Sequence, residues 1–335
     1  MELSEDELIG VIRKLLSGGV AGVEVGLGDD AAVVHPGSGS LVLTTDMLIE
    51  DVHFDRGSIS PHELGAKSIV VNVSDIAAMA GSPRYALVSL GLPDDVEAKW
   101  VVELYGGMRE ACDEYALTLV GGDTNRADVV VLSVTVVGEV ARGRAVTRGG
   151  AHPGDLVVVT GDLGGAAGGL LVSRMPAAEA ARALSTPWGR DLLDALFRPV
   201  ARVGEGQTLA QSGATAMMDL SDGLAKDLSR LCAESGVGAR LDLSRVPVSP
   251  ALRQAAPALG VDALELAIGG GEDYELLATI DATDVDRARA QLSERFGVTL
   301  TEVGVIIEGG LVATGPDGVE RVLEPKGWDH FRHDR

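Results

Sequence analysis

Aspartates at the ends of apolar runs are the side chains of this sequence best suited to chemistry. Asp30 follows a glycine turn, Asp46 ends LVLTTD, Asp123 ends LTLVGGD, and Asp219 closes ATAMMD with Asp222 three residues later. One such acid is ordinary turn chemistry. Acids from distant parts of the chain, each after an apolar run, favour a shared cation site at one edge of a sheet.

Asp75 lies inside the apolar stretch VVNVSDIAAMAG. An ionised carboxylate without a partner inside an apolar helix costs several kcal/mol, or else keeps its proton. Asp75 is therefore expected to have a partner. A local side-chain bond involving Asn72 or Ser74 is the alternative to a cation site, and the sequence leaves both open.

The donor atoms near these acids indicate the kind of metal. Hydroxyls at Thr44, Thr45 and Ser221 accompany the carboxylates, and no His or Cys stands beside them. Such hard oxygen donors suit Mg²⁺ and argue against zinc. Mg²⁺ commonly binds through one or two carboxylates plus substrate phosphates, so several acids predict several ions that bridge to a polyphosphate.

The stretch GLGDDAAVV, residues 26–34, comes close to the G-x-G-x-x-[GA] spacing of dinucleotide loops. Asp29 and Asp30, however, stand where phosphate would lie and would repel it. A cation between Asp30 and the phosphate resolves this conflict. No G-x-x-x-x-G-K-[ST] motif occurs, which excludes a P-loop protein.

Other residues are candidates for substrate contacts, each with a structural alternative. Arg148, beside a glycine pair, could hold a phosphate, although a lone arginine often faces solvent. Glu272 and Asp273 follow three glycines, as in an ordinary acidic turn. Trp328 could stack on a heterocycle or anchor the tail, and His53 could donate to substrate or be structural. The turn GDLGGAAGG could offer amides to a phosphate or only allow close helix packing.

The elements that position these residues alternate irregularly. Ser60, Pro61 and Glu63 predict the start of a buried helix that ends at Gly81. An amphipathic helix is expected from Val96 to about Tyr115. Strands are expected at LVLTTD, ALVSLGL, LTLVGGD, VVVLSVTVVGEV, HPGDLVVVT, ATAMMDL, YELLATI and LTEVGVII, and helices at LIGVIRKLL, DGLAKDLSRLCAESG and DVDRARAQLSERFG. Without strict βαβ alternation, the pattern favours an α+β fold.

Length and composition bound the rest. The 335 residues suit two domains, 1–150 and 151–335, with a restart at Pro153. A net charge of −22 argues against nucleic acid and anionic membrane partners. No apolar run is long enough to cross a bilayer and MELSEDEL does not read as a secretory signal, so a cytoplasmic protein is expected. Cys112 and Cys232 are expected to be reduced core thiols.

The motifs GDDAAVV, TTDMLIEDVHF, NVSDIAAMAGSP, GGDTNR, GRAVTRGGAHPGD, DLSDGLAKDL, GGGEDYELL and GWDHF follow one another over nearly the whole chain. As a set they resemble the thiamine-monophosphate kinase family, relatives of the aminoimidazole ribonucleotide and selenophosphate synthetases. The resemblance implies a two-domain ATP-binding architecture with mixed and antiparallel sheets flanked by helices, paired through its N-terminal domains in a homodimer. It also implies Mg²⁺-dependent transfer of phosphate from ATP to thiamine monophosphate.

The resemblance assigns roles motif by motif. Magnesium ligands would be Asp30, Thr45, Asp46, Asp75, Asp123, Asp219 and Asp222. Nucleotide contacts would be Tyr105, Gly122, Asp123, Arg148 and Ser221. Thiamine monophosphate would face His53, Glu272 and Trp328. The acids expected to be central to catalysis are Asp30, Asp75, Asp123 and Asp222.

Two alternatives remain at the level of the sequence. Another ATP-dependent synthetase of the same architecture would share the acids and differ in the acceptor pocket. A non-catalytic module that binds divalent ions would bind metal without turning over ATP, and it would leave Arg148 and the glycine-rich turn unexplained.

Overall fold

The chain forms two compact units. The computed structural model describes residues 23–25, 33–34, 37–315 and 317–328. Within these, one unit comprises the described parts of Met1–Ile76 with Gly81–Gly143, and the other comprises Ala77–Ala80 with the described parts of Arg144–Arg335. The predicted helix LIGVIRKLL, the loop that holds Asp29 and Asp30, and the end of the GWDHF motif lie outside the described residues.

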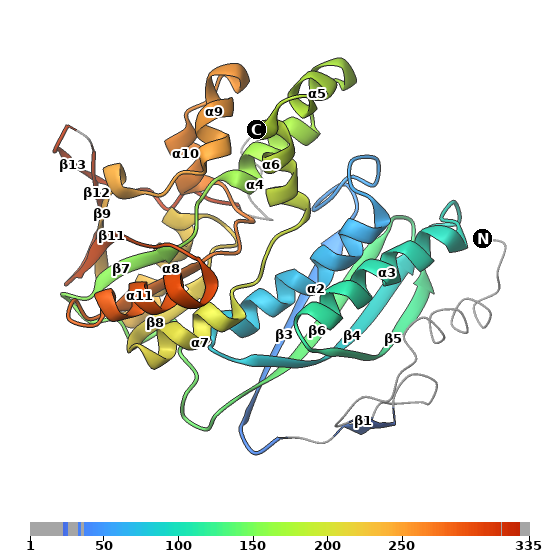
Figure 1. Ribbon diagram of the computed structural model, residues 1–335, viewed down its shortest axis with the longest axis horizontal. Helices are drawn as coiled ribbons and strands as arrows, with labels where there is room; N and C mark the ends of the chain where they lie inside the picture. The colour runs from blue at the N-terminus through green and yellow to red at the C-terminus, as the bar shows by residue number, and fades with distance from the viewer. Residues whose placement is uncertain (1–22, 26–32, 35–36, 316, 329–335) are drawn as a thin grey trace. The chain divides into compact units, whose positions relative to one another are not determined.

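A four-stranded sheet is the centre of the first unit. Its strands are β3 (Ser40–Ile49), β4 (Ser82–Leu92), β5 (Thr118–Arg126) and β6 (Val131–Val140). They lie in the order β3-β6-β4-β5, so β3 and β5 form opposite edges (Figure 1). β4 and β5 run parallel, and the other two pairs are antiparallel. A separate short pair joins β1 (Val23–Val25) to β2 (Val33–Val34).

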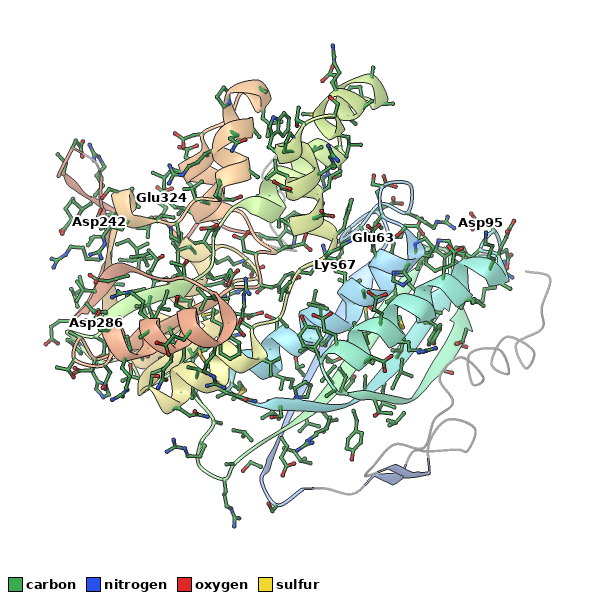
Figure 2. The ribbon with its side chains drawn as sticks, viewed as in Figure 1. Glu63, Lys67, Asp95, Asp242, Asp286 and Glu324 are labelled. Carbon is green, nitrogen blue, oxygen red and sulfur yellow. The ribbon has the colours of Figure 1, made fainter. Side chains whose placement is uncertain are left out.

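Two long helices, α2 (Pro61–Ala78) and α3 (Ala98–Glu114), run alongside each other in the first unit (Figure 1). The predicted capping box of α2 is confirmed: the amide of Glu63 donates to Ser60 Oγ at 3.2 Å, and Glu63 Oε2 accepts from the amide of Ser60 at 3.2 Å. Figure 2 labels Glu63 at this end of α2. The helices approach closely because Gly65 and Gly107 face backbone carbonyls, where a Cβ would collide.

Side chains alternate between the two faces of this sheet, as β structure requires. On one face Leu132, Val134 and Val88 are at most 1% exposed. On the other face Leu43 is 66% exposed and Met47 is 52% exposed. The first unit therefore has one buried sheet face and one apolar face that its own described residues leave open.

The second unit contains a seven-stranded sheet, in the order β13-β12-β9-β11-β7-β10-β8. Pairing is antiparallel except between β12 and β9. The strands are β7 (Leu156–Thr160), β8 (Ala214–Asp219), β9 (Gly238–Asp242), β10 (Leu276–Ile280), β11 (Leu300–Ile307), β12 (Leu311–Thr314) and β13 (Glu320–Val322).

Helices of the second unit contribute to two apolar cores. One core includes Leu192, Leu228 and Leu252, and the other includes Leu209, Leu292 and Met217. The helices are α4 (Gly165–Ser173), α5 (Ala177–Leu184), α6 (Pro187–Phe197), α7 (Val203–Gln211), α8 (Leu224–Ser235), η1 (Leu243–Arg245), α9 (Pro250–Leu259), α10 (Ala263–Gly269) and α11 (Val285–Phe296).

The predicted α+β class with mixed sheets is confirmed. Each strand expected from LVLTTD to LTEVGVII, and each expected helix within the described residues, is present. The helices α5, α6, α7, η1, α9 and α10 and the strands β1, β9, β12 and β13 were not predicted. Cys112 and Cys232 are buried free thiols, as expected. None of the described helices is long and apolar enough to cross a membrane.

Candidate functional site

The first unit brings Asp46 of β3 and Asp75 of α2 together. Thr44 Oγ1 donates to Asp75 Oδ2 at 2.5 Å, which links the strand to the helix. Burial, together with the nearby charge of Asp75, raises the pKa of Asp46 to about 6. Two carboxylates that repel one another in a partly desolvated place are stabilised by a shared cation.

Asn72 of α2 helps to hold Asp46 in place beside Asp75. Its Oδ1 accepts the amide of Asp46 at 3.0 Å, and its Nδ2 donates to the carbonyl of Ser68 at 3.0 Å. The Asn72 side chain is therefore engaged elsewhere, and Asp75 finds its hydrogen-bond partner on a different element, at Thr44. A local bond of Asp75 to Asn72 or Ser74 within α2 stays a prediction. Thr44, Asp46, Asn72 and Asp75 present only oxygen and amide donors, which is the ligand chemistry of Mg²⁺.

Thr45 and Asp123 do not join this group. Thr45 follows Thr44 along a strand, so its side chain takes the other sheet face, where its Oγ1 donates to the carbonyl of Val134 at 3.1 Å. Asp123 lies on β5, at the opposite edge from β3, which is roughly 14 Å away for three strand spacings. Its Oδ2 accepts from Asn125 Nδ2 at 2.6 Å.

Three further predicted residues of the first unit have structural partners. His53 Nδ1 accepts the amide of Ile49 at 3.0 Å, which orients the ring and leaves the proton of the neutral form on Nε2. Tyr105 is buried, and desolvation raises its pKa to about 12 against the opposing effect of a bond to Thr124. A Cβ at Gly122 would collide with the carbonyl of Val88, so close strand pairing already requires glycine there.

The second unit holds its acids around the turn from Leu220 to Gly223. Asp219, the last residue of β8, is 3% exposed. Asp222 Oδ2 contacts Lys226 Nζ at 3.3 Å and Arg230 Nη2 at 2.7 Å. Asp222 therefore carries two cationic partners from α8, which sequence reasoning did not anticipate.

The Asp227 side chain holds the backbone of this turn through hydrogen bonds. The fully buried side chain accepts the amides of Asp222 and Gly223 on Oδ2, at 2.9 and 3.1 Å. Its Oδ1 accepts from Arg230 Nη1 at 3.0 Å. Desolvation raises the pKa of Asp227. The signal that could have revealed Asp227 is an acid in the first turn of a helix directly after a glycine.

The loop Gly270–Glu275 lies against the same turn. The amide of Glu272 donates to the carbonyl of Ser221 at 2.8 Å, and that of Tyr274 donates to Leu220 at 2.9 Å. Glu272 and Tyr274 have φ values of 67° and 50°, in the left-handed region that non-glycine residues seldom adopt. Such strain marks functional loops when the surroundings enforce it.

Asp273, between those two residues, is partly buried and caps the glycine-rich turn. Its carboxylate accepts the amide of Gly164, the residue that precedes α4. Desolvation raises the pKa of Asp273 to about 8. The Gly164 amide therefore already has an acceptor within the chain. Gly168 and Gly169 closely approach Leu192 of α6, as the packing alternative expects. A phosphate at the other amides of GDLGGAAGG stays a prediction.

Arg148 and Trp328 both belong to the second unit. The Arg148 carbonyl accepts from Ser235 Oγ at 2.9 Å, and the residue is exposed. Trp328 is 44% exposed, and its amide donates to the carbonyl of Asp222 at 3.2 Å. The ring therefore lies on the tail beside the Asp222 turn and is not a core anchor.

The described residues contain no group of three or more His, Cys, Asp or Glu side chains arranged to hold a metal ion. They hold one acid pair in the first unit, where Asp123 lies on the opposite edge strand from Asp46, and a cation-paired acid turn in the second unit. Asp30 lies outside the described residues. The predicted convergence of all these acids on one pocket stays a prediction.

Two family models match the chain. The N-terminal domain of AIR synthase related protein matches residues 28–140, and its C-terminal domain matches residues 152–315. Two curated proteins named thiamine-monophosphate kinase are similar over nearly all of their length. That of Aquifex aeolicus (strain VF5) is 38% identical, over 98% of this chain and 99% of its own. That of Bacillus subtilis (strain 168) is 34% identical, over 92% and 94%.

Solved structures agree with these matches. Thiamine-monophosphate kinase from Stenotrophomonas maltophilia K279a is similar with a TM-score of 0.80 and 34% identity, over 95% of this chain and 98% of that one. AaThiL complexed with AMPPCP and TMP gives a TM-score of 0.75 and 37% identity, over 98% of each chain. E. coli HypE, a hydrogenase maturation protein, gives 0.77 at 19% identity, over 98% and 99%, which shows the fold alone.

Proposed function

The chain belongs to the thiamine-monophosphate kinase family, within the AIR synthase related proteins, and we propose that it transfers the γ-phosphoryl group of ATP directly to thiamine monophosphate. The products are thiamine diphosphate and ADP. This proposal depends on the similarity to AaThiL complexed with AMPPCP and TMP, which covers 98% of the chain. We take AMPPCP to be the ATP analogue and TMP to be thiamine monophosphate.

The acceptor's own chemistry supplies the nucleophile. A phosphate monoester has a second pKa near 6, so at neutral pH it is mostly dianionic and needs no general base. An acceptor phosphate oxygen attacks the γ-phosphorus in line, the bond to the β–γ bridging oxygen breaks, and ADP leaves with that electron pair. The chain's work is to align two anionic groups and to reduce their repulsion. No side chain need form a covalent intermediate.

The donor set of the first unit fits magnesium. Burial and the nearby charge of Asp75 raise the pKa of Asp46, Thr44 adds a neutral oxygen donor, and Asn72 Oδ1 accepts the amide of Asp46. Mg²⁺ bound there would neutralise charge on the ATP phosphates. Thr44, Asp46 and Asp75 would hold it, and Asn72 would keep Asp46 in place. Thr45 could contribute only its backbone oxygen to the same side, because its hydroxyl faces the other way.

The remaining roles are proposals that follow the family motifs. Further magnesium ligands would be Asp30, Asp123, Asp219 and Asp222. Nucleotide contacts would be Tyr105, Gly122, Asp123, Arg148 and Ser221. Thiamine monophosphate would face His53, Glu272 and Trp328. The exposed Arg148 fork suits a phosphate, and the carboxylate of Glu272 with the Trp328 ring suits the cationic thiazolium.

A homodimer joined through the first unit is part of the proposal. Four large apolar side chains are exposed on β3 and β4: Leu41, Leu43, Met47 and Leu87. The register aligns Leu43 with Val137 and Tyr85, and Thr45 with Thr135 and Leu87, so these residues share the open sheet face. Open apolar sheet faces mark interfaces, and a second copy of the chain would cover this one.

The test is product formation from ATP and thiamine monophosphate. The protein is expected to make ADP and thiamine diphosphate in equal amounts, only with a divalent cation. Single turnover with γ-labelled ATP is expected to label thiamine diphosphate with no labelled protein beforehand. A synthetase of the same architecture would leave thiamine monophosphate unchanged, and a non-catalytic module would bind ions without forming ADP. Either result overturns the proposal.

Cytoplasmic location and the lack of nucleic acid or membrane partners stay predictions.

A further inference from the structure

The backbone of Trp328 is held at both of its polar groups. Its amide donates to the carbonyl of Asp222 at 3.2 Å, and its carbonyl accepts from Lys226 Nζ. Residues 323–328 have no regular secondary structure, so these two bonds take the place of a strand or helix partner. One residue of the tail is thereby tied to the start of α8.

The close fit extends to the preceding residue. A Cβ at Gly327 would lie 2.6 Å from the carbonyl oxygen of Asp222 and 2.7 Å from Lys226 Cβ. Only glycine lets the tail come this near to the turn and to the stem of Lys226. The tail is therefore seated on α8, and the Trp328 ring, at 44% exposure, remains accessible beside the turn.

Lys226 has a second bond that connects the tail to an acid. The same Nζ that donates to Trp328 contacts Asp222 Oδ2 at 3.3 Å. A charged donor shared between a carboxylate and a carbonyl is a stronger tie than a neutral hydrogen bond. The Lys226 side chain is also only 18% exposed, which limits competition from water.

We propose that Lys226 is a positioning residue that sets the place of the Trp328 ring and links it to Asp222. This inference rests on the proposed function only in the claim that Trp328 faces thiamine monophosphate. Lys226 touches no reacting atom; it acts through Trp328. The Lys226 ammonium group thus connects Trp328, assigned to thiamine monophosphate, with Asp222, assigned to magnesium.

Arg230 provides a matched comparison. Its guanidinium also contacts Asp222 Oδ2, at 2.7 Å, and it pairs with Asp227. Its hydrogen bond and ion pairs are with Asp222 and Asp227, whereas the bond to the Trp328 carbonyl comes from Lys226. Removing Arg230 therefore takes a cation from Asp222 and leaves the tail bond, whereas removing Lys226 takes both.

The first experiment needs no catalysis. In a W100F/W188F background Trp328 is the one tryptophan left, since the chain has three. Acrylamide quenching of its fluorescence is expected to rise about twofold in K226M, stay near the parent value in R230M, and return toward it in K226R. Equal quenching in K226M and R230M, or no change in K226M, would overturn the inference.

The second experiment uses the full-length protein with its natural tryptophans. K226M is expected to raise KM for thiamine monophosphate about tenfold, which equals ~1.4 kcal/mol, and to change KM for ATP much less. R230M is expected to act mainly on ATP or Mg²⁺ dependence. A K226M effect of equal size on both substrates would count against positioning. If the parent protein fails to turn over thiamine monophosphate, the proposed function falls, while the quenching result still decides the role of Lys226.

Discussion

Both carboxylate oxygens of Asp273 accept the amide N–H of Gly164, at 3.0 and 2.8 Å. Gly164 directly precedes α4, so a partly buried carboxyl group of the chain accepts a hydrogen bond at the start of this helix. The two residues are 109 positions apart in sequence. This bond anchors the loop that carries Glu272, and it occupies the Gly164 amide of the glycine-rich turn.

Asp273 is expected to make stability fall as the pH rises. Its pKa is about 8 in the folded protein against an ordinary value of 3.8, so between these values the folded state binds more protons than the unfolded chain. Stability is then lost with increasing pH through this window. D273N keeps an oxygen for the Gly164 amide and removes the charge, so urea unfolding from about pH 5 to about pH 9 is expected to show a smaller loss.

The control is D262N. Asp262 caps α10 in the same unit through its Oδ1 and the amides of Leu264 and Glu265, at an exposed position. It is expected to leave the pH dependence unchanged. Parallel curves for the parent and D273N would show that the Asp273 carboxyl is not the titrating group.

Asp75 and Asp46 are expected to be required for turnover and for metal dependence. D75N and D46N preserve shape and remove one negative charge from the pair, so each is expected to lower kcat by about 100-fold or more and to raise the Mg²⁺ concentration for half-maximal rate. Initial rates over a magnesium titration measure both. D95N, which removes an exposed acid paired with Arg56 in the same unit, is expected to stay close to the parent. Unchanged magnesium dependence in D46N and D75N would exclude this pair as a metal site.

Two adjacent glycines of α3 are expected to respond oppositely to alanine. A Cβ at Gly107 would collide with the carbonyl of His62 on the neighbouring chain segment, whereas one at Gly106 would lie 3.7 Å from His62 Cδ2, in ordinary contact. G107A is expected to cost about 1–3 kcal/mol of unfolding free energy. G106A is expected to be neutral or to gain up to about 1 kcal/mol from helix propensity. Urea unfolding compares them, and equal values would mean that the helix crossing is not tight.

Leu43 is expected to decide the oligomeric state. It is 66% exposed on the open sheet face, on the edge strand β3. L43K places a charge there and is expected to convert a dimer to a monomer in light scattering at about micromolar concentration. L184K, at an exposed leucine of the second unit, is the matched change and is expected to leave the mass as in the parent. If the parent protein is monomeric, or if L43K remains a dimer, this sheet face is not the dimer interface.

Local signals in the sequence predicted the elements of the first unit well. The Ser60–Glu63 capping box and the all-round apolar pattern of α2 do not depend on distant residues, and both are confirmed. The short helices α5, α6 and α7 were missed because each spans at most 11 residues, which is too short for a helical period to be told apart with certainty. Thr186, the cap of α6, accepts the amide of Gly189 at 3.1 Å, and this cap followed by Pro187 was the available clue.

Side-chain partners were harder to predict than elements. The sequence indicates that Asp75 needs a partner, but Thr44 supplies it from 31 residues away, and no local pattern specifies that pairing. The group that accepts the Gly164 amide is the Asp273 carboxyl, whereas the sequence also allowed a bound phosphate at this position. Strand alternation could have separated Thr44 from Thr45, since neighbours in a strand face opposite sides.

The bond from the Asp46 amide to Asn72 has a second effect, on how the chain avoids unwanted association. β3 is ten residues long and pairs, among the described strands, with β6 alone, so one of its edges offers unused amides and carbonyls. Long bare edges invite strand addition by other molecules and thus aggregation. Asn72 occupies one of those amides midway along the strand. Asn72, which holds Asp46 in place, thereby also removes one hydrogen-bond donor that an added strand would need.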